Sequence, residues 1–270
     1  MKIVKVFIIA LLFVFGISNV GLAKENNDGN SSLTEKEYQY LLKNGHTEEE
    51  IKDLPIEVAK QLVKDKAIKQ NSGYIIKNFY EASNEESGEF FTTASISSSE
   101  LKLAGTVYKV TSDRSGYNKY YIYANFQWLK SPFWTLTDKM TIGFPSSSGF
   151  FLPTSNGSVT QHQHRYSYDA YGNGNWVDTP IKYTPSDWDP NAGVAGSYDL
   201  KKLSDFTLHK GYIGQYVYVR NTVHGDMNIK IEYGHRMYGG SPSVSVFPAG
   251  LSITPSSWTD TASYALTLTY

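Results

Sequence analysis

The chain of 270 residues contains no cysteine. This absence excludes disulfide bonds, a thiol nucleophile and thiolate metal ligands, so the fold must be held together by its core alone. An excess of charge of either sign is also missing, because 25 Lys and Arg residues nearly balance 26 Asp and Glu residues, leaving a net charge of −1. The sequence has no dense basic stripe, and we therefore exclude nucleic acid as a partner.

Long apolar runs are missing except at the N-terminus. Lys2 and Lys5 precede an unbroken apolar segment at residues 6–15, and residues 21–23 supply the small side chains that signal peptidase requires. This pattern predicts a secretory signal peptide over residues 1–23 and a secreted, extracellular protein. A transmembrane anchor is the alternative, but small and polar residues interrupt the run. We expect no integral membrane segment after leader cleavage.

Motifs of the common hydrolases are missing as well. The sequence contains neither the G-x-S-x-G nucleophile motif nor the H-E-x-x-H zinc motif. A glycosidase needs two carboxylates at a defined separation, and the C-terminal part has several Asp but only Glu100 and Glu232. We therefore expect a protein that is not an enzyme, and an unrecognised secreted hydrolase stays as an alternative.

Composition and hydrophobic periodicity change along the chain, and these changes predict its organisation. The predicted segments are a signal peptide (1–23), a disordered tether (24–33), a small helical module (34–70), a linker (71–99) and an antiparallel β domain (100–270). The tether is rich in Asn, Gly and Ser, and the linker combines an acidic run with a Ser/Thr-rich stretch.

Two capping boxes define the helical module. Thr34 is followed three residues later by Glu37, and Thr47 is followed by Glu50, so each pair can satisfy backbone amides at a helix start. A third helix is expected from about residue 56 to 69, with one apolar stripe. A bundle of this size is too small to be stable alone, so it must pack on something else.

The segment Leu41–Ile51, with the sequence LLKNGHTEEEI, resembles a segment near the N-terminus of many uncharacterised exported proteins of Bacillus-type Gram-positive bacteria. The resemblance covers only the helical module. It implies an exported Gram-positive protein and brings no catalytic residue with it.

From about residue 100 the apolar period becomes two, which is typical of strands. Residues 112–116 predict a hairpin turn, and the last strand, which reaches Tyr270, is expected at an edge or seam. The pattern predicts a mainly β fold, namely an antiparallel β-sandwich domain preceded by a small helical N-terminal module. An elongated all-β fold or an open barrel would show the same pattern. Residues 130–204 are rich in Gly, Ser, Pro and Asn and are expected to be mostly loop.

Alternating oxygen ligands at Asp187, Asp189 and Asn191 form a calcium candidate, because Ca²⁺ prefers carboxylate and amide oxygens. No Glu follows at the bidentate position of an EF-hand, and Pro190 constrains the loop. The alternative is an Asx-turn loop that packs Trp188. No cofactor other than calcium is expected.

His162 and His164 form a zinc candidate, because two His separated by one residue point the same way on a strand. A third ligand would have to come from Asp169 or from a distant His. The alternative is a pair of exposed histidines in a polar loop.

The chain is rich in aromatic residues, with 21 Tyr, 13 Phe and 5 Trp. Alternation places Tyr121 and Tyr123 on the outer face of a strand, opposite Ile122, where they can stack on sugar rings. We predict a recognition surface that contains Tyr121, Tyr123, Trp176 and Trp188, with a cell-surface component or a polysaccharide as partner. The alternative is that Tyr is simply favoured on a solvated sheet face.

Three functions remain open at this point. The leading hypothesis is a secreted, non-enzymatic binding or interaction protein with a cell-surface or glycan-like ligand. The second is a secreted β-type pore-forming or membrane-active toxin. Residues 92–99 and 157–164 are polar enough for a membrane-inserting hairpin, but neither has a long alternating apolar face. The third is the unrecognised secreted hydrolase.

Overall fold

The structure is a computed structural model that describes residues 32–80 and 98–270. The predicted signal peptide (1–23), most of the predicted tether (24–33) and residues 81–97 of the predicted linker lie outside the described residues. Within the described ranges no helix is long and apolar enough to cross a membrane.

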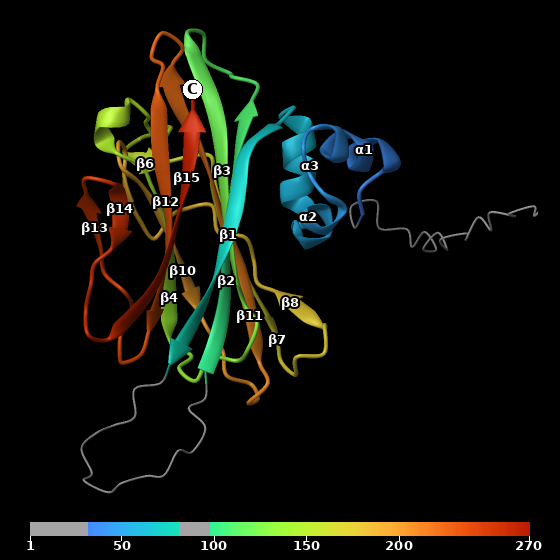
Figure 1. Cartoon of the computed structure of the whole chain (residues 1–270), viewed down its shortest axis with the longest axis vertical. Coiled ribbons are helices and arrows are strands. Elements are labelled where there is room, and N and C mark those ends of the chain that lie inside the picture. Colours follow the sequence, from blue (N-terminus) through green and yellow to red (C-terminus); the bar gives the residue numbers. More distant parts are fainter. Residues whose placement is uncertain (1–31, 81–97) are drawn as a thin grey trace, which may run out of the picture. The chain divides into compact units, whose positions relative to one another are not determined.

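Two antiparallel sheets face each other, which confirms the predicted β-sandwich (Figure 1). The first sheet contains, in spatial order, β1 (Ile68–Tyr80), β2 (Ser98–Val110), β3 (Tyr117–Trp128), β11 (Leu208–Arg220), β7 (His162–Asp169) and β8 (Trp176–Asp178). The second contains β15 (Thr259–Thr269), β12 (Asp226–Arg236), β4 (Thr137–Gly143), β10 (Gly193–Asp199) and β9 (Asp187–Asp189). Two short ribbons flank them, β13 (Val244–Phe247) with β14 (Gly250–Ile253) and β5 (Thr154–Ser155) with β6 (Ser158–Val159). A single 3₁₀ turn, η1, covers Ser146–Ser148.

Side chains that alternate along the strands fill the space between the sheets. Phe126 of β3 packs against Tyr233 of β12, with 4.5 Å between ring centroids, and against Tyr198 of β10 at 4.9 Å. All three side chains are at most 1 % exposed. The face of β3 predicted to be apolar therefore forms the core, as its period of two indicates.

The first and last strands lie side by side and close one side of the sandwich. Asn71 of β1 donates a side-chain hydrogen bond of 2.8 Å to the carbonyl oxygen of Thr267 in β15. At Gly73, an added Cβ would lie 1.8 Å from the hydroxyl of Tyr264, so a larger residue would require the Tyr264 ring to move. β15 is an edge strand of its sheet, which confirms the expectation for the C-terminal strand.

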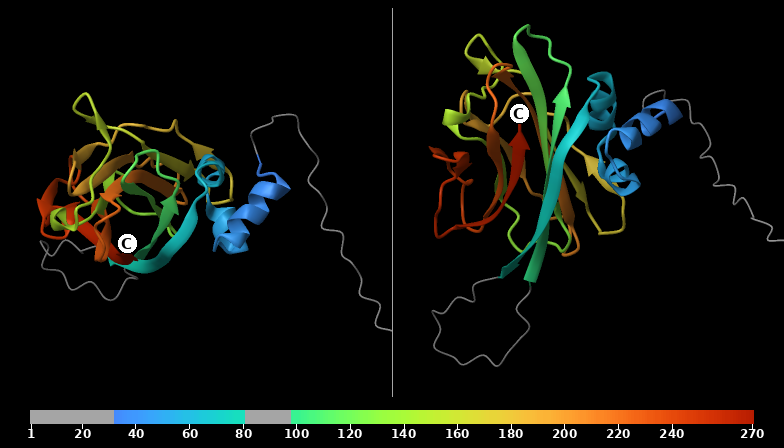
Figure 2. Two further views of the ribbon diagram at one scale, coloured as in Figure 1. Left: turned by 90° about the horizontal axis from the view of Figure 1, so that it is seen from above. Right: turned by 45° about the horizontal axis from the view of Figure 1, so that its top comes forward.

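Three short helices, α1 (Glu35–Lys43), α2 (Glu48–Asp53) and α3 (Ile56–Lys64), pack on the outer face of the six-stranded sheet (Figure 2). Their apolar stripe, which includes Leu41, Ile51 and Leu62, meets tyrosines of β2, β3 and β11. The helical module thus packs on the sheet, as its small size requires.

Both predicted capping boxes are confirmed, because Thr34 and Thr47 each exchange hydrogen bonds with the Glu three residues later. The third helix is shorter than predicted. It ends at Lys64 because Lys66 takes the left-handed conformation, with φ of 54°, and the chain turns there into β1.

Two predictions about the chain's organisation are corrected. Residues 71–80 of the predicted linker belong to β1, which pairs with β2 along its whole length, because Ile75 and Phe79 alternate into the core. Residues 130–204, expected to be mostly loop, contain β4, β7 and β10. These strands contain few of the β-branched residues that identify a strand, since their buried positions also hold His, Gly, Ala and Asp.

We expect Leu62→Ala to lower the free energy of unfolding by about 2–4 kcal/mol, because the side chain is 1 % exposed between α3 and the sheet. Leu203→Ala is the matched control, since Leu203 is 54 % exposed and its loss is expected to cost under about 0.5 kcal/mol. Urea unfolding monitored by circular dichroism measures both. Equal stability of Leu62→Ala and the unchanged protein would contradict the packing of the helical module described above.

Candidate functional site

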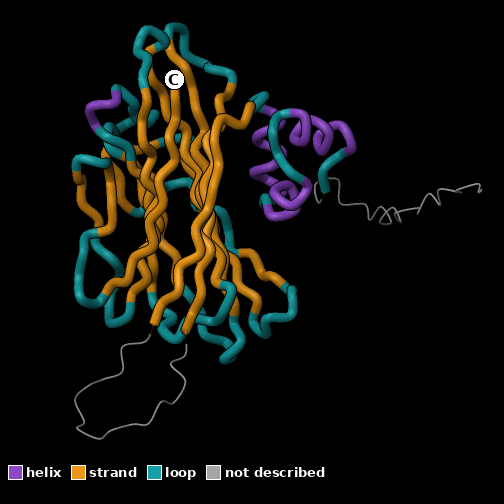
Figure 3. The backbone as a smooth tube through the Cα atoms, in the orientation of Figure 1, coloured by secondary structure: helices purple, strands orange, loops and turns teal. Residues whose placement is uncertain are grey.

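Exposed apolar side chains gather at one end of the sandwich, which we call the aromatic end. β1 ends there and β2 begins there, and the loops after β3, β7, β10, β12 and β14 converge on it (Figures 1 and 3). The aromatic end comprises Leu129 (37 % exposed), Phe133 (52 %), Trp134 (40 %), Tyr171 (70 %), Leu203 (54 %), Phe206 (71 %), Tyr238 (64 %) and Trp258 (53 %).

The opposite end of the sandwich differs in composition. Its described loops, at residues 111–116, 144–153 and 221–225, contribute no exposed large hydrophobic side chain. Other exposed apolar side chains lie on β1 and on the flanks of the sandwich, namely Ile68, Tyr74, Ile76, Val177, Tyr183, Trp188, Val246 and Phe247. Scattered apolar residues on a surface need no explanation, whereas a gathering of eight at one end of a sandwich is typical of an interaction surface. The aromatic end is therefore a candidate functional site.

Hydrogen bonds join the loops of the aromatic end to one another. Thr207 accepts a bond of 2.8 Å from the Ser204 amide and donates one of 3.2 Å to the Ala170 carbonyl, which links the loop after β10 to the loop after β7. The Leu200 amide donates to the Leu136 carbonyl at 3.1 Å and so reaches the loop after β3. Tyr238 and Trp258 pack against each other with tilted rings and 5.1 Å between their centroids. The exposed rings thus sit on a braced set of loops.

A buried carboxylate fixes the strands directly beneath these loops. Asp138, fully buried near the start of β4, accepts hydrogen bonds from the Tyr233 hydroxyl at 2.6 Å and the Arg236 amide at 2.8 Å, and contacts His235 Nδ1 at 2.9 Å. The Tyr233 hydroxyl in turn accepts from Trp128 Nε1 at 3.1 Å. This network joins β3 and β12 to β4 at the point where their loops leave the sandwich, and a buried polar group needs such a set of partners.

Lysines surround the apolar side chains of the aromatic end. Lys130, Lys201 and Lys202 are exposed in the loops after β3 and β10. Lys202 lies 3.2 Å from Asp205, and its ammonium is 5.7 Å from the Phe133 ring centroid. Long cationic side chains beside aromatic rings suit the boundary between an apolar phase and anionic headgroups.

The four aromatic residues predicted as one recognition surface do not form one. Tyr121 and Tyr123 do lie on the outer face of β3, but they are buried, at 0 % and 4 % exposure, because the helical module covers that face. Tyr121 accepts a hydrogen bond of 2.8 Å from Gln163. Trp176 is half-buried in β8, and Trp188 lies in β9 of the other sheet. Tyr121 and Tyr123 share one buried cluster, and of the four residues only Tyr123 and Trp176 line a common cleft.

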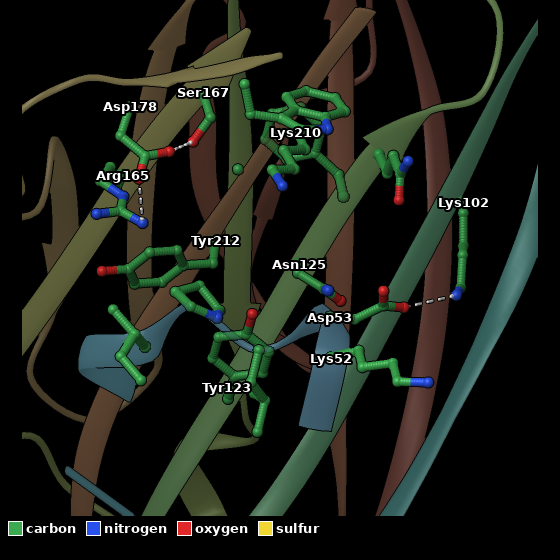
Figure 4. Close-up of a pocket in the computed structure, with 17 residues that line it drawn as sticks. Lys52, Asp53, Lys102, Tyr123, Asn125, Arg165, Ser167, Asp178, Lys210 and Tyr212 are labelled. Carbon is green, nitrogen blue, oxygen red and sulfur yellow. Dashed lines mark hydrogen bonds and ion pairs between the residues drawn. The ribbon is translucent and has the colours of Figure 1, made fainter. Parts of the chain in front are cut away.

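These two residues line a cleft of about 270 Å³ between α2 and the six-stranded sheet. Figure 4 shows an ion pair on each side of it, with Asn125 and Lys210 between them. On one side Arg165 pairs with Asp178 at 2.9 Å and with Glu57 of α3 at 3.1 Å. On the other side Lys102 lies 3.8 Å from Asp53.

The calcium candidates Asp187, Asp189 and Asn191 contact other protein groups. Asp187 forms an ion pair of 2.8 Å with Lys139, and the Asp189 carboxylate accepts the Asn191 amide at 2.9 Å in an Asx turn. Trp188 is 37 % exposed between them. Throughout residues 32–80 and 98–270, no group of three or more His, Asp or Glu side chains is placed to hold a metal ion.

The zinc candidates are buried rather than exposed. His162 Nε2 lies 2.9 Å from His164 Nδ1, and His162 Nδ1 lies 3.0 Å from the amide oxygen of Gln215. The Gln215 amide nitrogen donates to two carbonyls, so its oxygen accepts from His162, and His162 Nε2 accepts from His164. Burial lowers the pKa of His162 to about 4 and that of His164 to about 3. The pair is neutral and hydrogen-bonded within the sandwich.

The sequence interpretation missed the aromatic end. Its residues come from five loops that are far apart in the chain, and no single motif contains them. The segment Ser131–Trp134 (SPFW) was the available signal, because proline favours turns and loops, and Phe133 and Trp134 follow it directly. Sequence periodicity cannot show that these loops meet at one end.

We expect the free energy of unfolding to fall by at least about 2 kcal/mol between pH 7 and pH 5. Below the pKa of about 6.5 of an unfolded His, the unfolded chain binds protons that native His162 and His164 do not bind until about pH 4 and pH 3. His162→Gln should make this decline shallower, whereas His224→Gln, at an exposed position, should not. Urea unfolding at each pH measures it, and a stability independent of pH above 5 would refute the buried neutral pair.

The chain matches no known family model and no curated protein sequence. Among solved structures it is similar to Clostridium perfringens delta-toxin, with 9 % identity over 75 % of this chain and 93 % of that chain and a TM-score of 0.33. It is also similar to a "Pore forming protein" (8 % identity, 75 % of this chain and 95 % of that chain, TM-score 0.30). A third is the Clostridium perfringens NetB toxin in the membrane inserted form (9 %, 73 % and 97 %, TM-score 0.29). Similarity of this extent assigns neither a family nor a function.

Proposed function

We propose that this protein is exported and acts on lipid membranes, as a membrane-active protein of the β-type pore-forming kind. The aromatic end is the observation that carries the proposal. Its rings would enter the interface of a bilayer while the sandwich stays in water.

The chemistry of the aromatic end favours a lipid surface over a protein groove. Trp and Tyr are enriched at membrane interfaces, where the ring meets the acyl boundary and the polar edge meets headgroups. Eight separate apolar anchors, each contributing about 1 kcal/mol when withdrawn from water, together support reversible binding to a bilayer. Lys201, which has no carboxylate within 4.0 Å among the described residues, adds attraction to anionic headgroups, whereas Lys130 and Lys202 are paired with Glu100 and Asp205.

Two long strands end at the aromatic end. β1 and β2 have 13 residues each, more than the roughly 9–11 that a tilted strand needs to cross a bilayer. The chain leaves β1 and enters β2 on the face proposed to meet the membrane. This placement favours permeabilisation over docking alone, and the release of a trapped dye from liposomes separates the two activities.

A binding function that does not involve membranes is the second candidate. It is favoured by the polar cleft under α2, whose lining includes two of the aromatic residues that the sequence selected, Tyr123 and Trp176.

We expect the double variant Trp134→Ala/Phe206→Ala to bind liposomes at least tenfold more weakly than the unchanged protein. Each side chain is exposed at the aromatic end, at 40 % and 71 %, so its truncation removes membrane contact with little effect on the fold. Co-sedimentation with vesicles of phosphatidylcholine and phosphatidylglycerol measures the affinity, and dye release from the same vesicles measures permeabilisation.

The control is Trp188→Ala/Val246→Ala, which removes a 37 % and a 50 % exposed side chain from the flank of the sandwich. This variant should bind as the unchanged protein does. If both double variants bind equally well, or if the unchanged protein pellets with no vesicle composition, the membrane proposal is wrong.

A further inference from the structure

The cleft between α2 and the six-stranded sheet contains polar side chains that the protein itself does not use. Asn125 and Gln127 point from β3 into the cleft, and their amide groups have no hydrogen-bond partner within the described residues. Both residues are half-buried. Because no protein group occupies these amides, they are available to hydrogen-bond a ligand bound in the cleft.

The cleft also has more positive than negative charge. Its lining contributes four cationic side chains, Lys52, Lys102, Arg165 and Lys210, against the carboxylates of Asp53 and Asp178. Those two carboxylates are already occupied by Lys102 and Arg165. Lys52 and Lys210 therefore remain without a carboxylate within 4.0 Å in the part of the chain that the structure describes.

Lys210 is held in place although it lacks an ion pair. Its ammonium lies 4.2 Å from the Trp176 ring centroid, a cation–π contact that fixes the side chain along the cleft wall. Burial lowers the pKa of Lys210, and the Arg165 charge lowers it further, while Asp178 and Asp53 act against this change. The negative charge of an incoming anion would act against both effects, because it favours the charged ammonium.

We propose that this cleft binds an acidic sugar, a saccharide unit that carries a carboxylate. The carboxylate would meet the Lys210 ammonium, with Lys52 at the rim. The amides of Asn125 and Gln127 each offer a donor and an acceptor, which matches neighbouring hydroxyl groups on a sugar ring.

The size and the walls of the cleft agree with such a ligand. A volume of about 270 Å³ suits one ring rather than an extended chain. Leu54, Pro55 and Tyr123 supply apolar surface for the non-polar face of a ring. The site is independent of the aromatic end, so the two proposals can fail separately.

The test is isothermal titration calorimetry of the purified protein without lipid. The probes are N-acetylneuraminic acid, methyl glucuronide, methyl glucoside and inorganic phosphate. We expect the acidic sugars to bind, methyl glucoside to bind at least tenfold more weakly, and phosphate to bind weakly and independently of Asn125 and Gln127.

Lys210→Met should weaken binding of the acidic sugars at least tenfold, because it removes the charge and keeps an apolar side chain over Trp176. Asn125→Ala/Gln127→Ala should weaken it to a similar extent. Lys119→Met is the matched control, since Lys119 lies on the same face of the sheet, 4.5 Å from the Tyr216 ring centroid, but is paired with Asp113 outside the cleft. It should bind as the unchanged protein does.

Three results would overturn the proposal. One is the absence of binding by either acidic sugar at millimolar concentration. The second is equal binding of methyl glucoside and methyl glucuronide, which would mean that charge plays no part. The third is full binding by Lys210→Met with a circular dichroism spectrum like that of the unchanged protein, which would place the ligand elsewhere.

Discussion

The contact of Phe126 with Tyr233, at 4.5 Å between ring centroids, fixes the two sheets against each other near one end of the sandwich. Trp128 and Asp138 extend this contact by hydrogen bonds through the Tyr233 hydroxyl. Because adjacent antiparallel strands reverse direction, the loops that follow β3, β7, β10 and β12 must all emerge at this end. The aromatic end therefore depends on core packing, because its rings lie on five loops that leave the ends of packed strands.

The helical module covers the outer tyrosine face of the six-stranded sheet and forms one wall of the cleft. Its carboxylates bind tyrosine hydroxyls of the sheet: Glu57 accepts from Tyr212 at 2.8 Å, and Asp65 accepts from Tyr216. Burial and these neighbouring carboxylates raise the pKa of both tyrosines, so the hydroxyls stay protonated and donate. The cleft lies at the edge of the helical module, where Tyr212 forms part of its lining. Removing an acidic partner from such an interface would leave a buried hydroxyl unsatisfied, which favours keeping the module attached.

Local signals in the sequence predicted local structure well, and they failed where distant segments meet. The capping boxes at Thr34 and Thr47 and the two faces of β3 were predictable, because each depends on residues a few positions apart. The exposure of Tyr121 and Tyr123 was wrong because the residues that cover them lie more than fifty positions earlier. The aromatic end was missed for the same reason, because its residues come from loops that are far apart in the sequence. Periodicity shows that a strand has two faces, but it does not show what covers the outer one.

The two proposals give the protein separate surfaces for lipid and for sugar. The aromatic end is the more central of the two, and hydrogen–deuterium exchange tests it most directly. On adding vesicles of phosphatidylcholine and phosphatidylglycerol, the account predicts slower exchange in the loops at residues 129–136, 170–175 and 200–207, and no change at residues 111–116 and 221–225. Protection confined to the helical module or to the opposite end, or no protection with vesicles present, would contradict the account.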